Sequence, residues 1–138
     1  MGPGHNPLPP DLATAVAHWP EPAQLAFLHI RRIVLIAARD LPDLSLIETL
    51  KWGQPSWLPD RPRQGATLRA AWQAKRPDDI GLFVNCNTTL AETMRALYPA
   101  DFSYEGRRGL YVALAAPLPE QAIAHCAVLT LTYHRKTA

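Results

Sequence analysis

The chain has 138 residues, of which 48% are hydrophobic and 19% are charged, and its formal net charge is +2. This length and composition are typical of a single globular domain and exclude an intrinsically disordered chain. No apolar run reaches the ~18 residues of a membrane-spanning helix, and the small positive excess is too scattered to indicate nucleic-acid binding.

Two helices are predicted at the start of the chain, after a proline-rich lead-in over residues 1–10 that lacks the pattern of a secretory signal. Asp11 is a candidate N-cap for the first helix, which ends at Pro20. The second helix is predicted over residues 21–40, with Pro22 in its first turn. Because its apolar residues form one stripe and continue onto a second flank, we expect it to lie between a sheet and another helix.

Strands are predicted from residue 46 onward, where the hydrophobic spacing changes to alternation. The first strand is broken by Gly53 and Pro55, after which a short extended segment follows. A second alternating segment covers residues 68–75, although its alanines leave a helix as an alternative. Residues 80–86 form a short apolar run that is typical of a buried central strand.

The rest of the chain is predicted to contain a helix, a strand and a last helix. Thr89 and Glu92 have the spacing of a capping box, which predicts the start of a helix. An apolar strand is predicted over residues 110–117. Pro119 begins a helix that is predicted to run to about His134, although its second half alternates like a strand.

The order of these elements predicts an α+β fold. Runs of strands that are flanked by helices and joined by short links favour a mainly antiparallel sheet of about five strands, packed against the helices. We expect residues 11–138 to form this single domain. The two cysteines are 40 residues apart and have no metal-binding or redox spacing, which favours a reduced protein in the cytoplasm.

Five short segments, which follow a two-helix start and precede a closing helix, match the order and spacing of a known family over residues 12–134. They are ETLKWGQP at 48–55, AWQAK at 71–75, GLF at 81–83, GLYV at 109–112 and PLP at 117–119. In these segments the chain resembles the YdhG-like domains. The resemblance implies a compact α+β domain with a curved antiparallel sheet backed by helices. Most members have no known function, and some bacterial members are described as frataxin-like iron chaperones.

Iron is implied as a cargo by this resemblance alone. The role in frataxins depends on surface acidic residues, and oxygen-binding cations need several carboxylates that converge. The first two predicted helices carry widely spaced carboxylates only, at Asp11, Glu21 and Asp40.

The segment ETLKWGQPSWLP, over residues 48–59, is the richest candidate for a binding site. In one interpretation, alternation places Leu50 and Trp52 in the core, with Glu48 on the same face and paired to a nearby Arg or Lys. In the other, aromatic and polar side chains line a shallow pocket for a small molecule. The residues predicted for that pocket are Glu48, Lys51, Trp52, Gln54, Trp57, Trp72 and Lys75.

The sequence predicts no catalytic residue and no metal site. His125 and Cys126 are neighbours on a predicted helix, so their side chains diverge. Cys86 precedes a helix and is the better candidate for a reactive thiol, although a small core residue is the simpler interpretation. Arg107 and Arg108 are interpreted as charges on a surface turn, with contact to an anion as the alternative.

We therefore predict a non-enzymatic protein that binds a small molecule or a protein partner near the tryptophans. An intracellular iron chaperone is one alternative function. A homodimeric interaction module, formed through the second flank of helix 21–40 or through the sheet, is the other. Neither nucleic acid nor a membrane is an expected partner.

Overall fold

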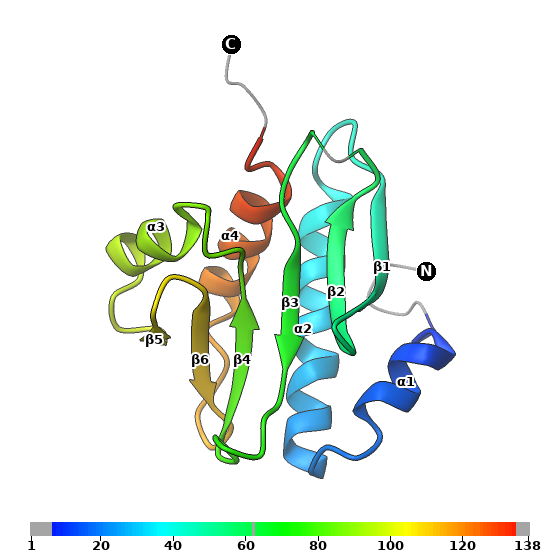
Figure 1. Cartoon of the computed structure of the whole chain (residues 1–138), viewed down its shortest axis with the longest axis vertical. Coiled ribbons are helices and arrows are strands. Elements are labelled where there is room, and N and C mark those ends of the chain that lie inside the picture. The colour runs from blue at the N-terminus through cyan, green and yellow to red at the C-terminus, as the bar shows by residue number, and fades with distance from the viewer. Residues whose placement is uncertain (1–6, 62, 135–138) are drawn as a thin grey trace.

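A computed structural model describes residues 7–61 and 63–134, so most of the lead-in predicted for residues 1–10 lies outside the described residues. Four helices and six strands follow one another along these described residues (Figure 1). Their bounds are α1 (Pro10–Val16), α2 (Glu21–Arg39), β1 (Leu46–Lys51), β2 (Gln54–Pro59), β3 (Leu68–Ala71), β4 (Asp79–Phe83), α3 (Leu90–Leu97), β5 (Ser103–Glu105), β6 (Gly109–Ala113) and α4 (Glu120–Leu131).

The strands form an open antiparallel sheet in the order β1-β2-β3-β4-β6-β5. Every neighbouring pair is antiparallel, which confirms the predicted α+β class. Across the middle of the sheet, Ser56 pairs with Arg69, Arg69 with Phe83, and Phe83 with Gly109. The sheet has one strand more than predicted, because β5 is three residues long and too short to show alternation.

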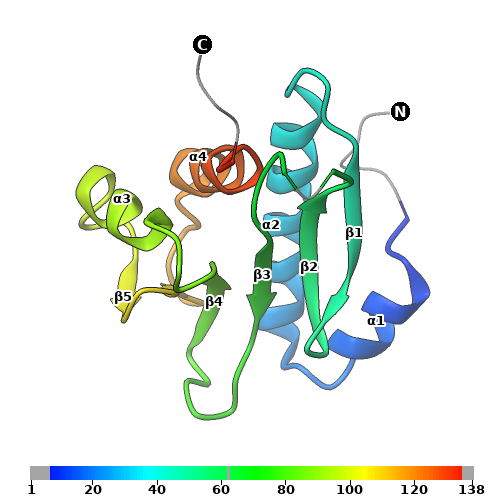
Figure 2. The same ribbon diagram turned by 45° about the horizontal axis from the view of Figure 1, so that its top comes forward.

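Helices α2 and α4 lie on the same side of the sheet and leave the opposite face of β3, β4 and β6 uncovered by any described helix (Figures 1 and 2). Helix α2 contacts both the sheet and α4, as the spacing of its apolar residues predicted. Its second apolar flank is not fully covered, since Leu25 and Leu28 are exposed. None of the helices in the described residues is long and apolar enough to cross a membrane.

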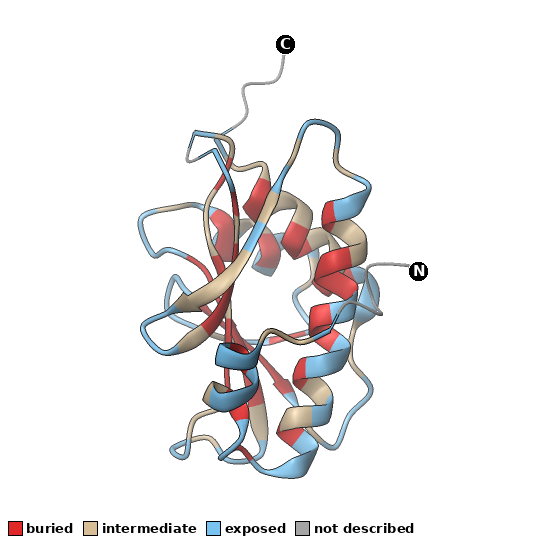
Figure 3. Ribbon diagram, turned by 90° about the vertical axis from the view of Figure 1, so that its right-hand side faces the viewer, coloured by how far each residue is buried: buried red, intermediate tan, exposed pale blue. Residues whose placement is uncertain are grey.

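The core lies between the helical layer and the sheet, where the buried residues of both elements meet (Figure 3). Phe27 of α2 stacks on Trp57 of β2 with ring centroids 6.2 Å apart, and Trp19 meets Phe27 edge to face at 5.8 Å. Trp57 and Phe27 are completely buried. Aromatic residues of this size contribute heavily to a core, and truncating one to alanine costs about 3–5 kcal/mol.

Two predicted helix caps were wrong, although α3 does begin at Leu90 with Thr89 at the N-cap position, as predicted. Helix α1 begins at Pro10 with Pro9 at the N-cap, so Asp11 lies inside the first turn, where proline is preorganised for a helix. The capping box of Thr89 and Glu92 does not form, because Thr89 makes no side-chain cap bond. The neighbouring hydroxyl of Thr88 instead accepts a hydrogen bond from the backbone N–H of Leu90 at 3.3 Å.

The segment predicted as a strand over residues 68–75 forms a shorter strand, since β3 ends at Ala71. The chain then turns towards β4, and the indole of Trp72 donates a hydrogen bond to the carbonyl of Pro77 at 3.0 Å across this turn. The last helix was predicted well: α4 covers Glu120–Leu131 without a break.

Candidate functional site

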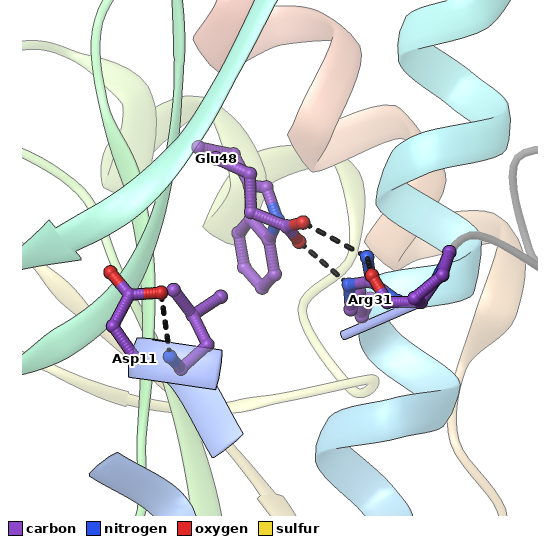
Figure 4. A network of polar contacts seen from close by, with 6 residues as sticks. Asp11, Arg31 and Glu48 are labelled. Carbon is purple, nitrogen blue, oxygen red and sulfur yellow. Dashed lines mark hydrogen bonds and ion pairs between the residues drawn. The ribbon is translucent and has the colours of Figure 1, made fainter. Parts of the chain in front are cut away.

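Glu48 lies in a closed charge cluster on the helix-facing side of the sheet (Figure 4). Arg31 of α2 donates to both carboxylate oxygens, from Nε at 2.7 Å and from Nη2 at 2.9 Å. The indole of Trp57, the strand partner of Glu48 on β2, donates to the same carboxylate at 2.8 Å. The predicted pairing of Glu48 with a basic residue is confirmed. These contacts are those of a structural ion pair, because three donors already occupy the carboxylate.

Trp52 lies at the tip of the β1–β2 hairpin, and 89% of its surface is exposed. The interpretation that Trp52 packs in the core was wrong, because β1 ends at Lys51 and the alternation ends with it. Trp52 has φ +57° and Gly53 has φ +74°, the positive values that a two-residue type I′ turn requires. For a residue with a side chain this left-handed conformation costs about 1–2 kcal/mol. The protein thus holds a large exposed ring on a strained backbone.

The hairpin tip forms one wall of a hollow of about 250 Å³. Lys51 and Trp52 line this wall, and Arg69 of β3 and Arg108, which precedes β6, also line the hollow. Thr67 and the segment 84–86 complete the lining. Figure 3 shows the tip leaning away from the helical layer, towards the open side of the sheet. We name this cavity the first hollow; its described lining has three cationic side chains and no carboxylate.

Arg69 is held in place without an acidic partner among the described residues. Its Nη1 donates to Oε1 of Gln54 at 2.7 Å, and its guanidinium carbon lies 5.7 Å from the ring centroid of Phe83. Partial burial, and after it the positive charge of Arg108, lowers the pKa of Arg69. Among the described residues, no ion pair forms to Arg69, Arg108 or Lys51. The positive charge of the first hollow is therefore not compensated within the described chain.

A second hollow, of about 220 Å³, shares Arg69 and Arg108 with the first. Its other lining residues are Gln54, Gln73, Lys75, Phe83, Glu105 and Tyr111. The two hollows adjoin at the shared arginines and lie over the open faces of β3, β4 and β6. The second differs from the first in having one carboxylate, that of Glu105.

Phe83 and Tyr111 form a small separate core on this open face with Ala71. Their rings meet edge to face with centroids 5.6 Å apart, over Gly81, where an added Cβ would lie only 2.8 Å from the ring of Phe83. Burial raises the pKa of Tyr111, and the hydrogen bond that its hydroxyl donates to Glu105 at 3.1 Å raises it further.

Arg76 contrasts with Arg69, because its charge is compensated. Its guanidinium carbon lies 3.5 Å from the ring centroid of Tyr111, while its Nη2 lies 3.0 Å from a carboxylate oxygen of Asp79. A carboxylate oxygen of Glu105 is 3.8 Å from its Nη1. Arg76 therefore fixes the Tyr111 ring and the β3–β4 turn, and it adds little net charge to the second hollow.

The structure divides the seven predicted pocket residues among four places. Lys51 and Trp52 line the first hollow, and Gln54 and Lys75 line the second. Glu48 and Trp57 belong to the closed cluster on the opposite side of the sheet, and Trp72 is bound to Pro77 in the β3–β4 turn. Sequence reasoning missed Arg69 as a site residue, and it considered Arg108 only as an alternative anion contact on a surface turn. A basic residue inside the otherwise apolar β3 was the available signal for Arg69.

The two cysteines lie in opposite environments. Cys126 is completely buried in α4, and this burial raises the pKa of its thiol to about 12. Cys86 is exposed and lines the first hollow, so its interpretation as a core residue was wrong. Strand β4 ends at Phe83, which leaves Cys86 in the loop that follows.

In the part of the chain that the structure describes, no group of three or more His, Cys, Asp or Glu side chains could hold a metal ion. Comparisons with protein-family models, curated proteins and solved structures found no match to this chain. The resemblance to YdhG-like domains, and the iron chaperone that it implies, stay predictions. What the fold and the site define is an α+β protein with a basic hollow on the open face of its sheet.

Proposed function

We propose that the protein binds a small anionic ligand in the first hollow, between the hairpin tip and Arg108. The observation that supports this function is the lining of the hollow, which brings three cations together without a carboxylate among the described residues. A guanidinium presents a planar fork of donors that matches the oxygens of a phosphate or a carboxylate. Arg69 lies on β3, and Arg108 is the residue immediately before β6. Together they are suited to hold one anionic group between them.

The arrangement is also preorganised for binding. Arg69 is fixed by its hydrogen bond to Gln54 and by its contact with Phe83, so little side-chain freedom is lost when it binds an anion. Burial lowers the pKa of Arg69, and the nearby positive charge of Arg108, which repels it, lowers this pKa further. An anion placed between the two guanidinium groups replaces this repulsion by attraction.

We propose binding rather than catalysis at this site. The described lining includes the Cys86 thiol, but it includes neither a histidine nor a carboxylate that would activate a thiol as a nucleophile. The other polar groups of the lining belong to Lys51, Thr67, Arg69, Asn85 and Arg108, and with the ring of Trp52 they are suited to recognise a ligand without transforming it.

Isothermal titration of the protein with inorganic phosphate at low ionic strength tests this function. We expect saturable binding in the wild-type protein and a loss of affinity of at least tenfold in Arg108→Ala. Arg107→Ala is the matched control, because Arg107 is the exposed neighbour of Arg108 and lines neither hollow. Equal affinity of all three proteins for phosphate, or no binding by the wild type, would contradict the proposed function.

A further inference from the structure

The sequence and the fold leave the identity of residue 52 unexplained. The first central position of a type I′ turn is usually occupied by Asn, Asp or Gly, which tolerate positive φ. Trp52 occupies it at φ +57° and makes no ring contact with another described residue. Neither the turn nor the core therefore accounts for a tryptophan here.

The position of Trp52 beside the first hollow explains why a tryptophan occurs at this turn. Its side chain lines the same hollow as Lys51, Arg69 and Arg108. A volume of about 250 Å³ lies just below the range of roughly 300–1,000 Å³ that drug-sized ligands occupy. The hollow thus admits a small compound that has one anionic group for the arginines and one flat group for the indole. Stacking of a ligand ring on an exposed tryptophan adds affinity with little dependence on the identity of the ring.

The other aromatic rings of this face do not offer the same contact. Phe83 and Tyr111 are buried, and the guanidinium groups of Arg69 and Arg76 lie over their rings. A sheet that binds a nucleic-acid strand needs several exposed rings on which successive bases stack. Because Trp52 is exposed while Phe83 and Tyr111 are buried, the face favours a ligand with a single ring system over a strand.

We infer that the ligand class is a small aromatic phosphate, of the size of phenyl phosphate or a nucleoside monophosphate, whose phosphate lies between Arg69 and Arg108 and whose ring stacks on Trp52. This inference rests on the proposed function and narrows it to a chemical class. Lys51 adds a cation on the Trp52 side of the hollow.

Titration calorimetry with four probes separates the phosphate contribution from the ring contribution. The probes are inorganic phosphate, phenyl phosphate, adenosine 5′-monophosphate and adenosine. We expect the two aromatic phosphates to bind about tenfold or more tightly than inorganic phosphate, because a stacked ring is worth this much in other proteins. Adenosine, which lacks the anion, is expected to bind most weakly.

Variants of two residues assign each contribution. Trp52→Gly, which suits positive φ and should fold normally, is expected to bring the affinity for aromatic phosphates down to that of inorganic phosphate. The affinity of Trp52→Gly for inorganic phosphate is expected to stay unchanged. Arg108→Ala is expected to weaken the binding of all three phosphates, and Arg107→Ala none of them.

The outcomes distinguish this inference from the proposed function. If phosphate and aromatic phosphates bind the wild type equally, and Trp52→Gly changes neither, the ring inference is overturned while the anion site stands. If none of the phosphates binds, both are overturned. If affinity rises steadily with the length of a single-stranded oligonucleotide, the mononucleotide-sized class is overturned in favour of a strand.

Discussion

The two faces of the sheet hold two arginine clusters that differ in the presence of a carboxylate. On the helix-facing side, Arg31 shares two hydrogen bonds with Glu48, and Trp57 donates a third to the same carboxylate. On the open side, Arg69 and Arg108 share the first hollow, whose described lining has no acidic group. The cluster on the helix-facing side is largely buried, and the cluster on the open side is accessible to solvent.

This difference separates structural from functional charges. A buried charge without a partner is costly, so the pair of Arg31 and Glu48 has to be complete for the core to form. Arg69 and Arg108 keep contact with water and can remain uncompensated at a small cost to stability. Their like charges do not stabilise the fold, and in the function proposed above an anion bound between them would offset their repulsion.

The largest expected effect is the loss of Glu48. Glu48→Ala leaves the guanidinium of Arg31 in the core without its carboxylate, and we expect the free energy of unfolding to fall by about 3–5 kcal/mol. Urea denaturation followed by tryptophan fluorescence measures this change. A loss below about 1 kcal/mol would show that the helix-facing cluster is not the structural element that its contacts indicate.

The two cysteines also differ in burial, and the burial of Cys126 predicts how the free energy of unfolding changes at alkaline pH. The pKa of Cys126 is raised to about 12 in the folded protein, so its contribution to stability is complete below about pH 9. Above pH 9 the unfolded chain releases the thiol proton while the folded protein keeps it. The free energy of unfolding should therefore fall as the pH rises from 9 towards 12, by about 1.4 kcal/mol per pH unit from this group.

Cys126→Ala is the control for this pH dependence. We expect the variant to lose stability less steeply above pH 9 than the wild type. Burial raises the pKa of Tyr104 in both proteins, and the variant removes Cys126, a second cause of that raised pKa, which makes the difference larger. Thiol labelling at neutral pH completes the contrast, because exposed Cys86 should react in the native state and Cys126 only after unfolding. Parallel pH profiles for the two proteins would refute the assignment to Cys126.

A smaller effect of opposite sign is expected at the hairpin tip. Trp52→Gly removes the conformational cost of positive φ but gives more freedom to the unfolded chain, so we expect a net gain in stability of about 0.5–1 kcal/mol. Thermal unfolding monitored by circular dichroism measures this gain. A clear loss of stability would mean that the indole packs against the protein after all, contrary to its exposure.

The smallest change in stability is expected on the open face. Arg108→Ala should alter the free energy of unfolding by less than about 0.5 kcal/mol, because the side chain is exposed and has no ion pair among the described residues. Urea denaturation of this variant beside Glu48→Ala compares the two clusters directly. A loss of several kcal/mol would contradict the division into a structural and a functional cluster.

Local patterns predicted much of this fold. Alternation correctly identified β1, and helical spacing correctly identified α2, because both signals depend on residues that are close in sequence. The need of Glu48 for a basic partner was also predictable, since an unpaired carboxylate on an apolar strand face is costly. Which residue supplies the charge was not, because Arg31 lies 17 positions away on a helix.

The site was harder to predict than the fold. The alternating pattern of β1 was continued to Trp52, one residue beyond the end of the strand, and therefore predicted a buried side chain. The turn itself was not predictable, because Trp-Gly is not one of the common sequences of a type I′ turn. Arg69 and Arg108 are 39 positions apart in the sequence. They approach each other because β6 pairs with β4, which in turn pairs with β3, as well as with its sequence neighbour β5. Pairing across non-consecutive strands is a tertiary property, which single-sequence patterns do not contain.

The comparison of the two clusters is tested most directly by an NMR titration with inorganic phosphate that follows the side-chain Nε–Hε signals of the arginines. The account predicts saturable shifts for Arg69 and Arg108, with no change for buried Arg31 and only weak, non-saturating change for exposed Arg107. Uniform weak shifts at every exposed arginine, or no shift at Arg69 and Arg108, would contradict an anion site on the open face.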